Sequence, residues 1–191
     1  TFEKVYNLGC IVEPKSFAVG VRMEHPQELI NRNAYGDCEY KLPTADYKVT
    51  YQTSLNRGVY SFCMCPGGYV VNASSEEGCL VTNGMSNVAR DSNNANSALL
   101  VNVNVADYYQ NDVLDGVKFL KKYESLCYNK YGNFIAPVQL VKDFLNDTPS
   151  TKLGDVIPSI KPGYHLGTIS DVLPPFVSET LKEGLRILDK K

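Results

Sequence analysis

The first half of the chain alternates apolar and polar residues, as strands with one buried face do. Residues 15–25 place four apolar side chains two positions apart, and Pro26 then opens a short helical segment that runs to residue 33. Further strand patterns lie between turn residues at 47–53, 58–65, 69–74 and 79–84. The close spacing of the last three predicts an antiparallel meander.

A polar segment interrupts this series of strands. Residues 86–97 are rich in asparagine and show no periodicity, whereas residues 98–105 resume the alternation of a strand. We therefore predict a long polar loop at 86–97. Long loops between strands commonly carry binding residues, which makes this loop a candidate site.

The second half of the chain has the period of helices. Apolar residues lie on one face of a predicted helix that follows Asp107 and stops at Gly132. A shorter helix is expected from Pro137 to just before Pro149, then a long turn-rich connection over 150–170, and a last helix from Pro174 and Pro175 onward.

Strands that precede helices in this way predict an α+β fold. We expect an antiparallel β-sheet with the connectivity of a meander, followed by a helical subdomain. The 191 residues are 43% hydrophobic, enough for one core. We expect a single inserted substrate or cap domain over 1–191, with 1–106 mainly β-sheet and 107–191 mainly helical.

The charge distribution and the absence of targeting signals limit the classes of partner and the location that we expect for this protein. The 19 basic and 21 acidic residues form no run of either sign, which argues against nucleic acid and anionic membrane as partners. No apolar stretch approaches the roughly 20 residues of a membrane span, and the first residues do not resemble a signal peptide. We expect a cytoplasmic protein, and the start at Thr1 suggests a fragment of a longer one.

Two of the six cysteines, Cys63 and Cys65, lie two residues apart in a predicted strand. A disulfide between them is disfavoured, since the Cα atoms of such a pair are roughly 6.5 to 7 Å apart. Zinc needs about four ligands, but the only histidines are the isolated His25 and His165, so we predict no metal. Small apolar packing residues are the simplest interpretation; a nucleophilic or redox role stays open. His25 is either a structural histidine or a base.

The residues after this pair have the composition of a tight turn. Pro66, Gly67 and Gly68 suit such a turn, and the glycines also permit a ligand or another backbone segment to come close. In the polar loop, hydrogen-bonding residues are candidate contacts for a substrate or cofactor, although asparagine is also an ordinary turn residue; they are Arg90, Asp91, Asn93, Asn94 and Asn96. No Gly-x-Gly-x-x-Gly or phosphate loop occurs, so the chain by itself shows no nucleotide-binding unit.

Several blocks of the chain, in order, resemble the uncharacterised bacterial FAD-dependent (NAD(FAD)-utilising) dehydrogenases. Among them are KSFAVGVRMEHPQELI, NRGVYSFCMCPGGYVVNASSEEG and NGMSNVARDSNNANSALLVNV. The resemblance implies a much longer polypeptide, in which a C-terminal substrate or cap domain like this one is inserted into the FAD-binding domain. It implies FAD in the full-length protein, NAD(P)H as reductant and an unknown small-molecule substrate. The FAD-binding domain of the same polypeptide would be the partner, and the fragment alone is expected to be inactive and without FAD.

A second, looser resemblance to a family of flavoproteins implies which residues of the sheet face the flavin or the substrate. Tyr60, Phe62, Pro66 and Gly84 resemble the residues of geranylgeranyl-reductase-like flavoproteins that line a substrate cavity over the flavin. It implies that one set of residues faces the flavin or substrate, namely Tyr60, Phe62, Pro66, Gly67, Gly68, Arg90, Asp91, Asn93 and Asn96. Because the domain would be inserted, its ends are expected to lie close together.

Two alternatives to the cap domain stay open at this point. One is a non-enzymatic module that binds a partner protein through its sheet edge or helices. The other is a thiol-redox module that uses Cys63 and Cys65. No catalytic residue is assigned, and Cys63, Cys65 and His25 are the candidates.

Overall fold

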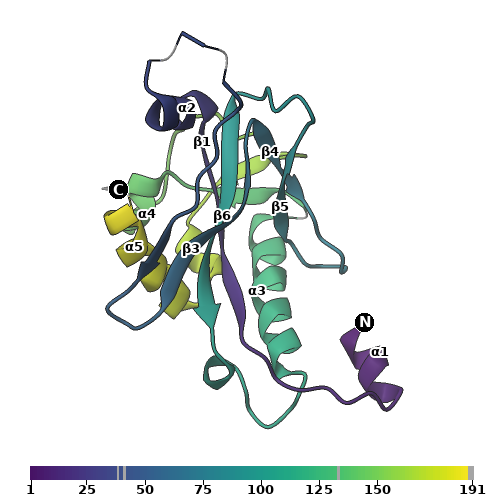
Figure 1. The fold of residues 1–191 in the computed structure, drawn as a ribbon. Helices are drawn as coiled ribbons and strands as arrows, with labels where there is room; N and C mark the ends of the chain where they lie inside the picture. The colour runs from purple at the N-terminus through teal and green to yellow at the C-terminus, as the bar shows by residue number, and fades with distance from the viewer. Residues whose placement is uncertain (38, 41, 133, 189–191) are drawn as a thin grey trace.

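The computed structural model describes residues 1–37, 39–40, 42–132 and 134–188. Its main element is a four-stranded antiparallel sheet in the order β1-β6-β3-β2 (Figure 1). The strands are β1 (Phe17–Pro26), β6 (Asn94–Val103), β3 (Gly58–Cys65) and β2 (Thr50–Gln52). Strand β1 pairs along its whole length with β6 and forms one edge of the sheet.

The register divides the sheet into two faces, because successive side chains of a strand point to opposite sides. Val101 of β6 lies opposite Val19 of β1 and Val59 of β3, and this row projects to one face. The next row consists of Gly20, Leu100 and Tyr60 and projects to the other face. We call the first the helix face and the second the open face.

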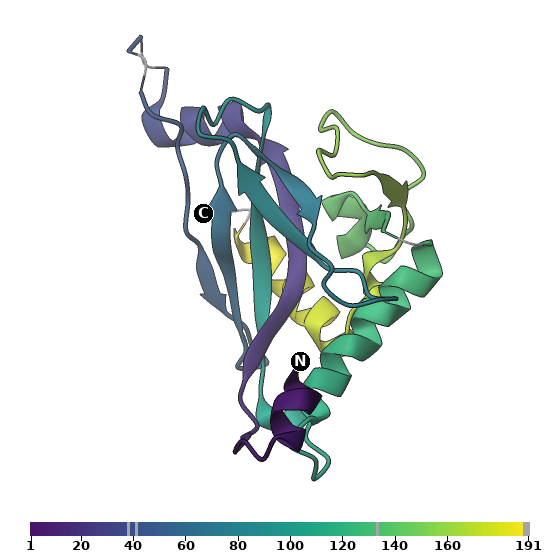
Figure 2. The same ribbon diagram turned by 90° about the vertical axis from the view of Figure 1, so that its right-hand side faces the viewer.

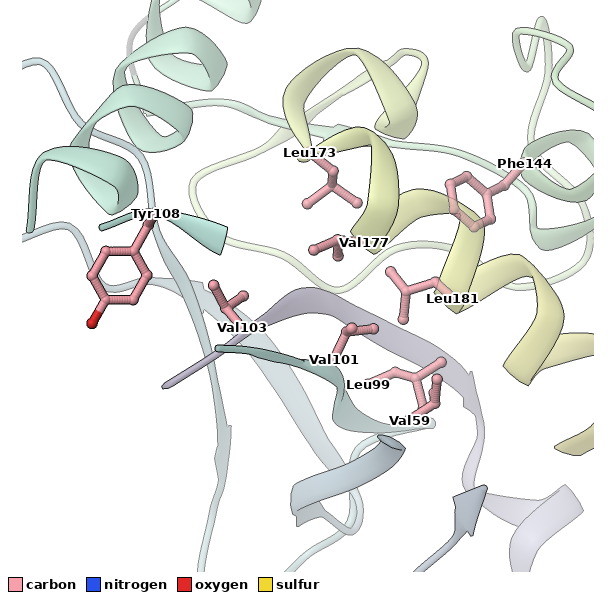
Figure 3. Close-up of a cluster of buried hydrophobic side chains, with 9 residues drawn as sticks. All are labelled: Val59, Leu99, Val101, Val103, Tyr108, Phe144, Leu173, Val177 and Leu181. Atoms are coloured by element: carbon pink, nitrogen blue, oxygen red, sulfur yellow. The ribbon is translucent and has the colours of Figure 1, made fainter. Parts of the chain in front are cut away.

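Helix α5 (Pro175–Leu188) covers the helix face and contacts all four strands. Its apolar residues recur at helical spacing, and Val177 and Leu181 are fully buried. Gly184 allows the close approach, since a Cβ atom there would lie 2.8 Å from a methyl group of Val59. Figure 3 shows α5 above the strands, with a core made of Val59, Leu99, Val101, Val103, Tyr108, Phe144, Leu173, Val177 and Leu181.

A bidentate ion pair joins the turn before β3 to the chain after β6. Nη2 of Arg57 lies 2.5 Å from Oδ1 of Asp107, and Nη1 lies 2.8 Å from Oδ2. Asp107 also accepts a hydrogen bond from the backbone N–H of Asn104, and the guanidinium lies 4.5 Å from the ring centroid of Phe176. The Arg57 guanidinium holds the pKa of Asp107 below its ordinary value. Both side chains are largely buried, so the pair holds these segments together.

The remaining elements form a second layer around α3 (Asp115–Tyr131), which ends at Gly132 as predicted. They include the hairpin of β4 (Gly68–Asn72) with β5 (Thr82–Ser86) and the parallel pair of β7 (Ala136–Val138) with β8 (Tyr164–Leu166). Their shared core consists of Val70, Leu80, Cys127, Ala136, Ile160 and Val172. Short elements complete the fold: α1 (Phe2–Asn7), α2 (Gln27–Tyr35), α4 (Val141–Leu145), η1 (Val105–Asp107) and η2 (Ile169–Val172).

The α+β class with an antiparallel sheet is confirmed, but the predicted meander through β3, β4 and β5 is wrong. Strand β3 pairs with β2 and β6, whereas β4 leaves the sheet and pairs with β5 alone. The strand expected at 79–84 lies at Thr82–Ser86, because Cys79 and Leu80 are buried ahead of it. Turn residues correctly marked the reversal between β4 and β5, but β3 pairs with the distant β6 and does not pair with β4.

Two further predictions of secondary structure are corrected. Strand β6 begins at Asn94, so the polar loop ends at residue 93, because pairing with β1 outweighs the low strand propensity of asparagine. Pro137 does not start a helix: it lies in β7, opposite His165 of β8, which itself lies in the predicted turn-rich connection. Only α4 remains of the helix expected there.

The described ends of the chain do not meet. Helix α1 and the end of α5 lie well apart in both views, contrary to our expectation (Figures 1 and 2). No residue of α1 is buried, and residues 8–16 lead away from it to β1 without regular structure. Among the described residues, no helix combines the length and apolar content that a bilayer crossing requires.

Candidate functional site

The open face of the sheet carries two of the predicted site residues, Tyr60 and Phe62. Both project to the side opposite α5, and Phe62 is 61% exposed although it lies in the middle of a sheet. No helix of the described residues crosses the part of this face formed by β2, β3 and β6, which points toward the viewer in Figure 1. An exposed aromatic side chain on a rigid strand is a typical contact for another protein layer.

Beyond Phe62 the strand is irregular. The register of β3 against β6 shifts between Phe62 and Cys65, and Cys63 adopts a φ of 48°, which is rare for a residue with a side chain. Cys63 is exposed, whereas Cys65 is buried and its Sγ lies 3.4 Å from the carbonyl oxygen of Cys63. The irregularity therefore places the two thiols in different environments.

Arg22 of β1 holds this irregular segment. Its Nη1 donates to the carbonyl oxygen of Cys63 at 3.1 Å and to Oδ1 of Asn96 at 3.0 Å, and its Nη2 donates to Oδ1 of Asn83 at 2.8 Å. The guanidinium thus joins β1, β3, β5 and β6 at one point. Gly84 makes room for it, since a Cβ atom there would lie 2.5 Å from Nη1.

The thiols do not form a reactive pair with this arginine. Burial raises the pKa of the Cys65 thiol, and the nearby charge of Arg22 only partly opposes that effect. The five described cysteines are free thiols, and the described residues contain no group of three or more His, Cys, Asp or Glu arranged to hold a metal ion. The arrangement can fix a backbone conformation but shows no activated nucleophile.

The turn of Pro66, Gly67 and Gly68 is buried, and neighbouring backbone fills the space next to it. A Cβ atom at Gly67 would lie 1.8 Å from the carbonyl oxygen of Arg90, and one at Gly68 would lie 2.1 Å from that of Met85. Gly67 also has a φ of 47°. The close approach that these glycines permit is thus made by the chain itself.

The loop residues Arg90, Asp91 and Asn93 are exposed and lie together. They line a polar hollow of about 390 Å³ against α2 and Thr44. Because Gly67 touches Arg90, the structure brings the turn and the loop next to each other. Asn96 lies elsewhere: it is in β6, fully buried, and its Nδ2 has no hydrogen-bond partner.

His25 lies apart from the other candidates. It shares the helix face with Met23, since it is two residues further along β1, and its ring lies 5.3 Å from that of Tyr47. Burial lowers the pKa of His25, and its Nε2 is buried without a hydrogen-bond partner. A histidine on the opposite face of the sheet cannot act together with Phe62 or Cys63.

Two residues of this region were missed by the sequence analysis. Arg22 is the only basic side chain of Lys or Arg type in β1 and follows the small residues Ala18 and Gly20 on the same face, which was the available signal. Gln27 opens α2, is buried, and accepts a hydrogen bond from the backbone N–H of Gly67 at 2.7 Å. Nothing in the sequence distinguishes Gln27 from an ordinary surface glutamine.

Comparison with known proteins identifies the family of this chain. Residues 16–191 match the model of the family described as "FAD-dependent protein, C-terminal domain-like". An "Uncharacterized protein" from Clostridium beijerinckii is 54% identical over 195 aligned positions that include the whole of this chain. The chain spans only 37% of the length of that relative. The chain therefore belongs to the family of C-terminal domains of FAD-dependent proteins.

Proposed function

We propose that this chain is the substrate-binding and cap domain of an FAD-dependent oxidoreductase, where it covers the flavin and shapes the substrate pocket. The observation that carries the proposal is the open face, on which Phe62 and Tyr60 project from a rigid sheet and are covered by no helix of the part of the chain that the structure describes. Such a surface suits a second protein layer. The remaining length of the relative leaves room for that layer in the same polypeptide.

The residues of this chain do not fit as the holder of FAD. Dinucleotide binding uses a parallel βαβ unit with a glycine-rich turn before the helix. The parallel strands among the described residues, β7 and β8, have only three residues each, and the sequence contains no Gly-x-Gly-x-x-Gly. We therefore assign FAD, and NAD(P)H as the reductant, to the full-length protein, and we expect the 191-residue chain alone to be free of FAD and inactive.

Within the full-length protein, the cofactor supplies the redox chemistry. Phe62 and Tyr60 would exclude water from the side of the flavin that they cover. Arg90, Asp91 and Asn93 would provide polar contacts for the flavin or the substrate beside the buried turn. No residue of this chain is assigned a nucleophilic role.

The test uses the full-length polypeptide and the variant Phe62→Glu. A charge on the open face should loosen the contact with the flavin, so quenching of flavin fluorescence by iodide should increase and anaerobic reduction by NAD(P)H should slow about tenfold. The control is Ile157→Glu, because Ile157 is 62% exposed, like Phe62, but lies in the loop before Ser159. Equal behaviour of the two variants, or full-length protein purified without FAD, would contradict the proposal.

The same experiments address the alternatives. Full-length protein that lacks flavin would point to a non-enzymatic interaction module that uses the open face. Loss of turnover in Cys63→Ser or Cys65→Ser, with FAD retained, would point to the thiol-redox module. The raised pKa of Cys65 predicts unchanged turnover for Cys65→Ser.

A further inference from the structure

Two adjoining cavities lie between β1 and the second layer of the fold and share no lining residue with the polar hollow of the loop. Their volumes are about 330 and 280 Å³, and both are lined by β1, β7 and Ile169. Together they follow β1 from Ala18 to Glu24, a distance of about 20 Å at the rise of an extended strand. We call this pair the β1-edge cavity.

The walls of the β1-edge cavity are mainly apolar. Helix α3 contributes Phe119 and Leu120, β7 contributes Val138, and the segment before α5 contributes Leu173. Leu100 of the open face also lines the larger cavity, so the cavity borders the surface that carries Tyr60. A volume of this size with apolar walls is typical of a site for a small molecule.

The polar groups available to a ligand are mostly backbone groups of β1. This strand pairs with β6 on one side only, so alternate N–H and C=O groups on its other side point toward α3 and β7 (Figure 2). The residues of β1 that line the cavity are half-buried, and backbone groups that are shielded from water need hydrogen-bond partners. The N–H and C=O groups of β1 that point away from β6 suit a ligand with an uncharged hydroxyl or carbonyl group.

The charged side chains around the cavity are not available for a ligand. Arg22 is the only basic residue among the described residues that line it, and its guanidinium already donates to Cys63, Asn96 and Asn83. The Glu24 carboxylate accepts hydrogen bonds from the backbone N–H and hydroxyl of Ser159. A ligand with a charged group would find no partner in these two residues.

Glu124 of α3 adds a further argument against an anionic ligand. Its residue lines the larger cavity. A carboxylate brought into the cavity would be repelled by the charged form of Glu124. The chemistry of the walls therefore selects for a neutral molecule.

We infer that the β1-edge cavity binds an elongated, uncharged apolar molecule that carries at most a neutral polar group, such as a long-chain alcohol. Its role as the substrate rests on the proposed function, because only a flavin partner would make the bound molecule react. Binding itself does not depend on that function.

The experiment is equilibrium dialysis of the full-length protein against linear alcohols of six to fourteen carbons, with decanoate as the charged counterpart of decanol. Affinity should rise about three- to fourfold for each added methylene until the cavity is filled, and then level off. Decanoate should bind at least tenfold more weakly than decanol. Because binding is measured directly, the result does not depend on turnover or on the redox state of the flavin.

Two variants place the binding in this cavity. Ala18→Leu adds a larger side chain to its wall and should weaken decanol binding at least fivefold. The control is Ala106→Leu at an exposed position, which should leave the affinity unchanged. Leu120→Ala enlarges the cavity and should move the plateau to a longer alcohol, which keeps the test decisive if Ala18→Leu does not fold.

Absence of binding for every alcohol would overturn the inference. Equal binding of decanol and decanoate, or equal effects of the variants in the wall and at Ala106, would also overturn it. Alcohol binding without flavin reduction or reoxidation would support the cavity and count against its role in the proposed function. A flavin effect of Phe62→Glu without alcohol binding would support the cap domain and remove this ligand class.

Discussion

The side-chain amide of Gln27 anchors Gly67: its Oε1 accepts the backbone N–H of that glycine at 2.7 Å, and both groups are buried. The Nε2 of the same amide donates to the carbonyl oxygen of Ala45 at 2.8 Å. One side chain thus satisfies two backbone groups from segments far apart in the sequence. The turn between β3 and β4 is held by α2, and not by a hairpin of its own.

Replacement of this amide should destabilise the fold. Gln27→Ala leaves the N–H of Gly67 and the carbonyl of Ala45 without this partner, which should cost about 2 to 3 kcal/mol of unfolding free energy. Urea unfolding followed by circular dichroism measures it. Gln52→Ala makes the same chemical change at an exposed site and should cost less than about 0.5 kcal/mol. Similar losses for the two variants would contradict the anchoring role of Gln27.

A methyl group at Gly84 should disturb the Arg22 contacts. Its Cβ would lie 2.2 Å from Oδ1 of Asn96 and 2.5 Å from Nη1 of Arg22, so these atoms must move apart. We expect Gly84→Ala to lower the unfolding free energy by about 1 to 3 kcal/mol. In Gly154→Ala the added atom would be 3.5 Å from Leu140, which is an ordinary contact, so this control variant should be nearly neutral. Thermal unfolding measures the stability of both variants.

The pairing of Asp107 with Arg57 predicts a pH dependence of stability. Because Arg57 lowers the folded-state pKa of Asp107, its contribution is complete above the unfolded-state pKa of about 3.9 and is lost as the pH falls through the lower folded-state value. Asp107→Asn should cost about 3 kcal/mol at pH 7, with a cost that shrinks below about pH 4. Urea unfolding at pH 7, 5, 4 and 3 measures this. The control is Asp37→Asn at an exposed position. The effect of this variant on the unfolding free energy should not shrink at low pH in the way expected for Asp107→Asn.

The cysteines should differ in their reaction with iodoacetamide. Cys63 is exposed, whereas Cys65 and Cys127 are buried, and burial raises the pKa of Cys127 to about 11. At pH 8 in the native protein, Cys63 should be alkylated at least tenfold faster than either buried thiol. Mass spectrometry of the peptides gives the rates, and the same reaction in urea should remove the difference. Equal native rates would show that the irregular end of β3 opens readily.

The local sequence pattern was sufficient to predict those strands and helices whose apolar residues recur with the period of that element. The alternation along β1 and β3, and the helical spacing in α3 and α5, correctly predicted strands and helices, and Gly132 correctly marked the end of α3. These regularities follow from the geometry of a single segment. The same holds for the α+β class, which depends on the order of such segments.

Contacts between distant segments account for what the pattern missed. Arg22 reaches across 41 and 74 positions to Cys63 and Asn96, and pairing with β1 draws Asn94 and its neighbours from the predicted loop into β6. Periodicity describes which face of a segment is apolar, but not which segment will cover it or which polar groups will meet. For that reason the open face around Phe62 and the β1-edge cavity became visible only once the chain was folded.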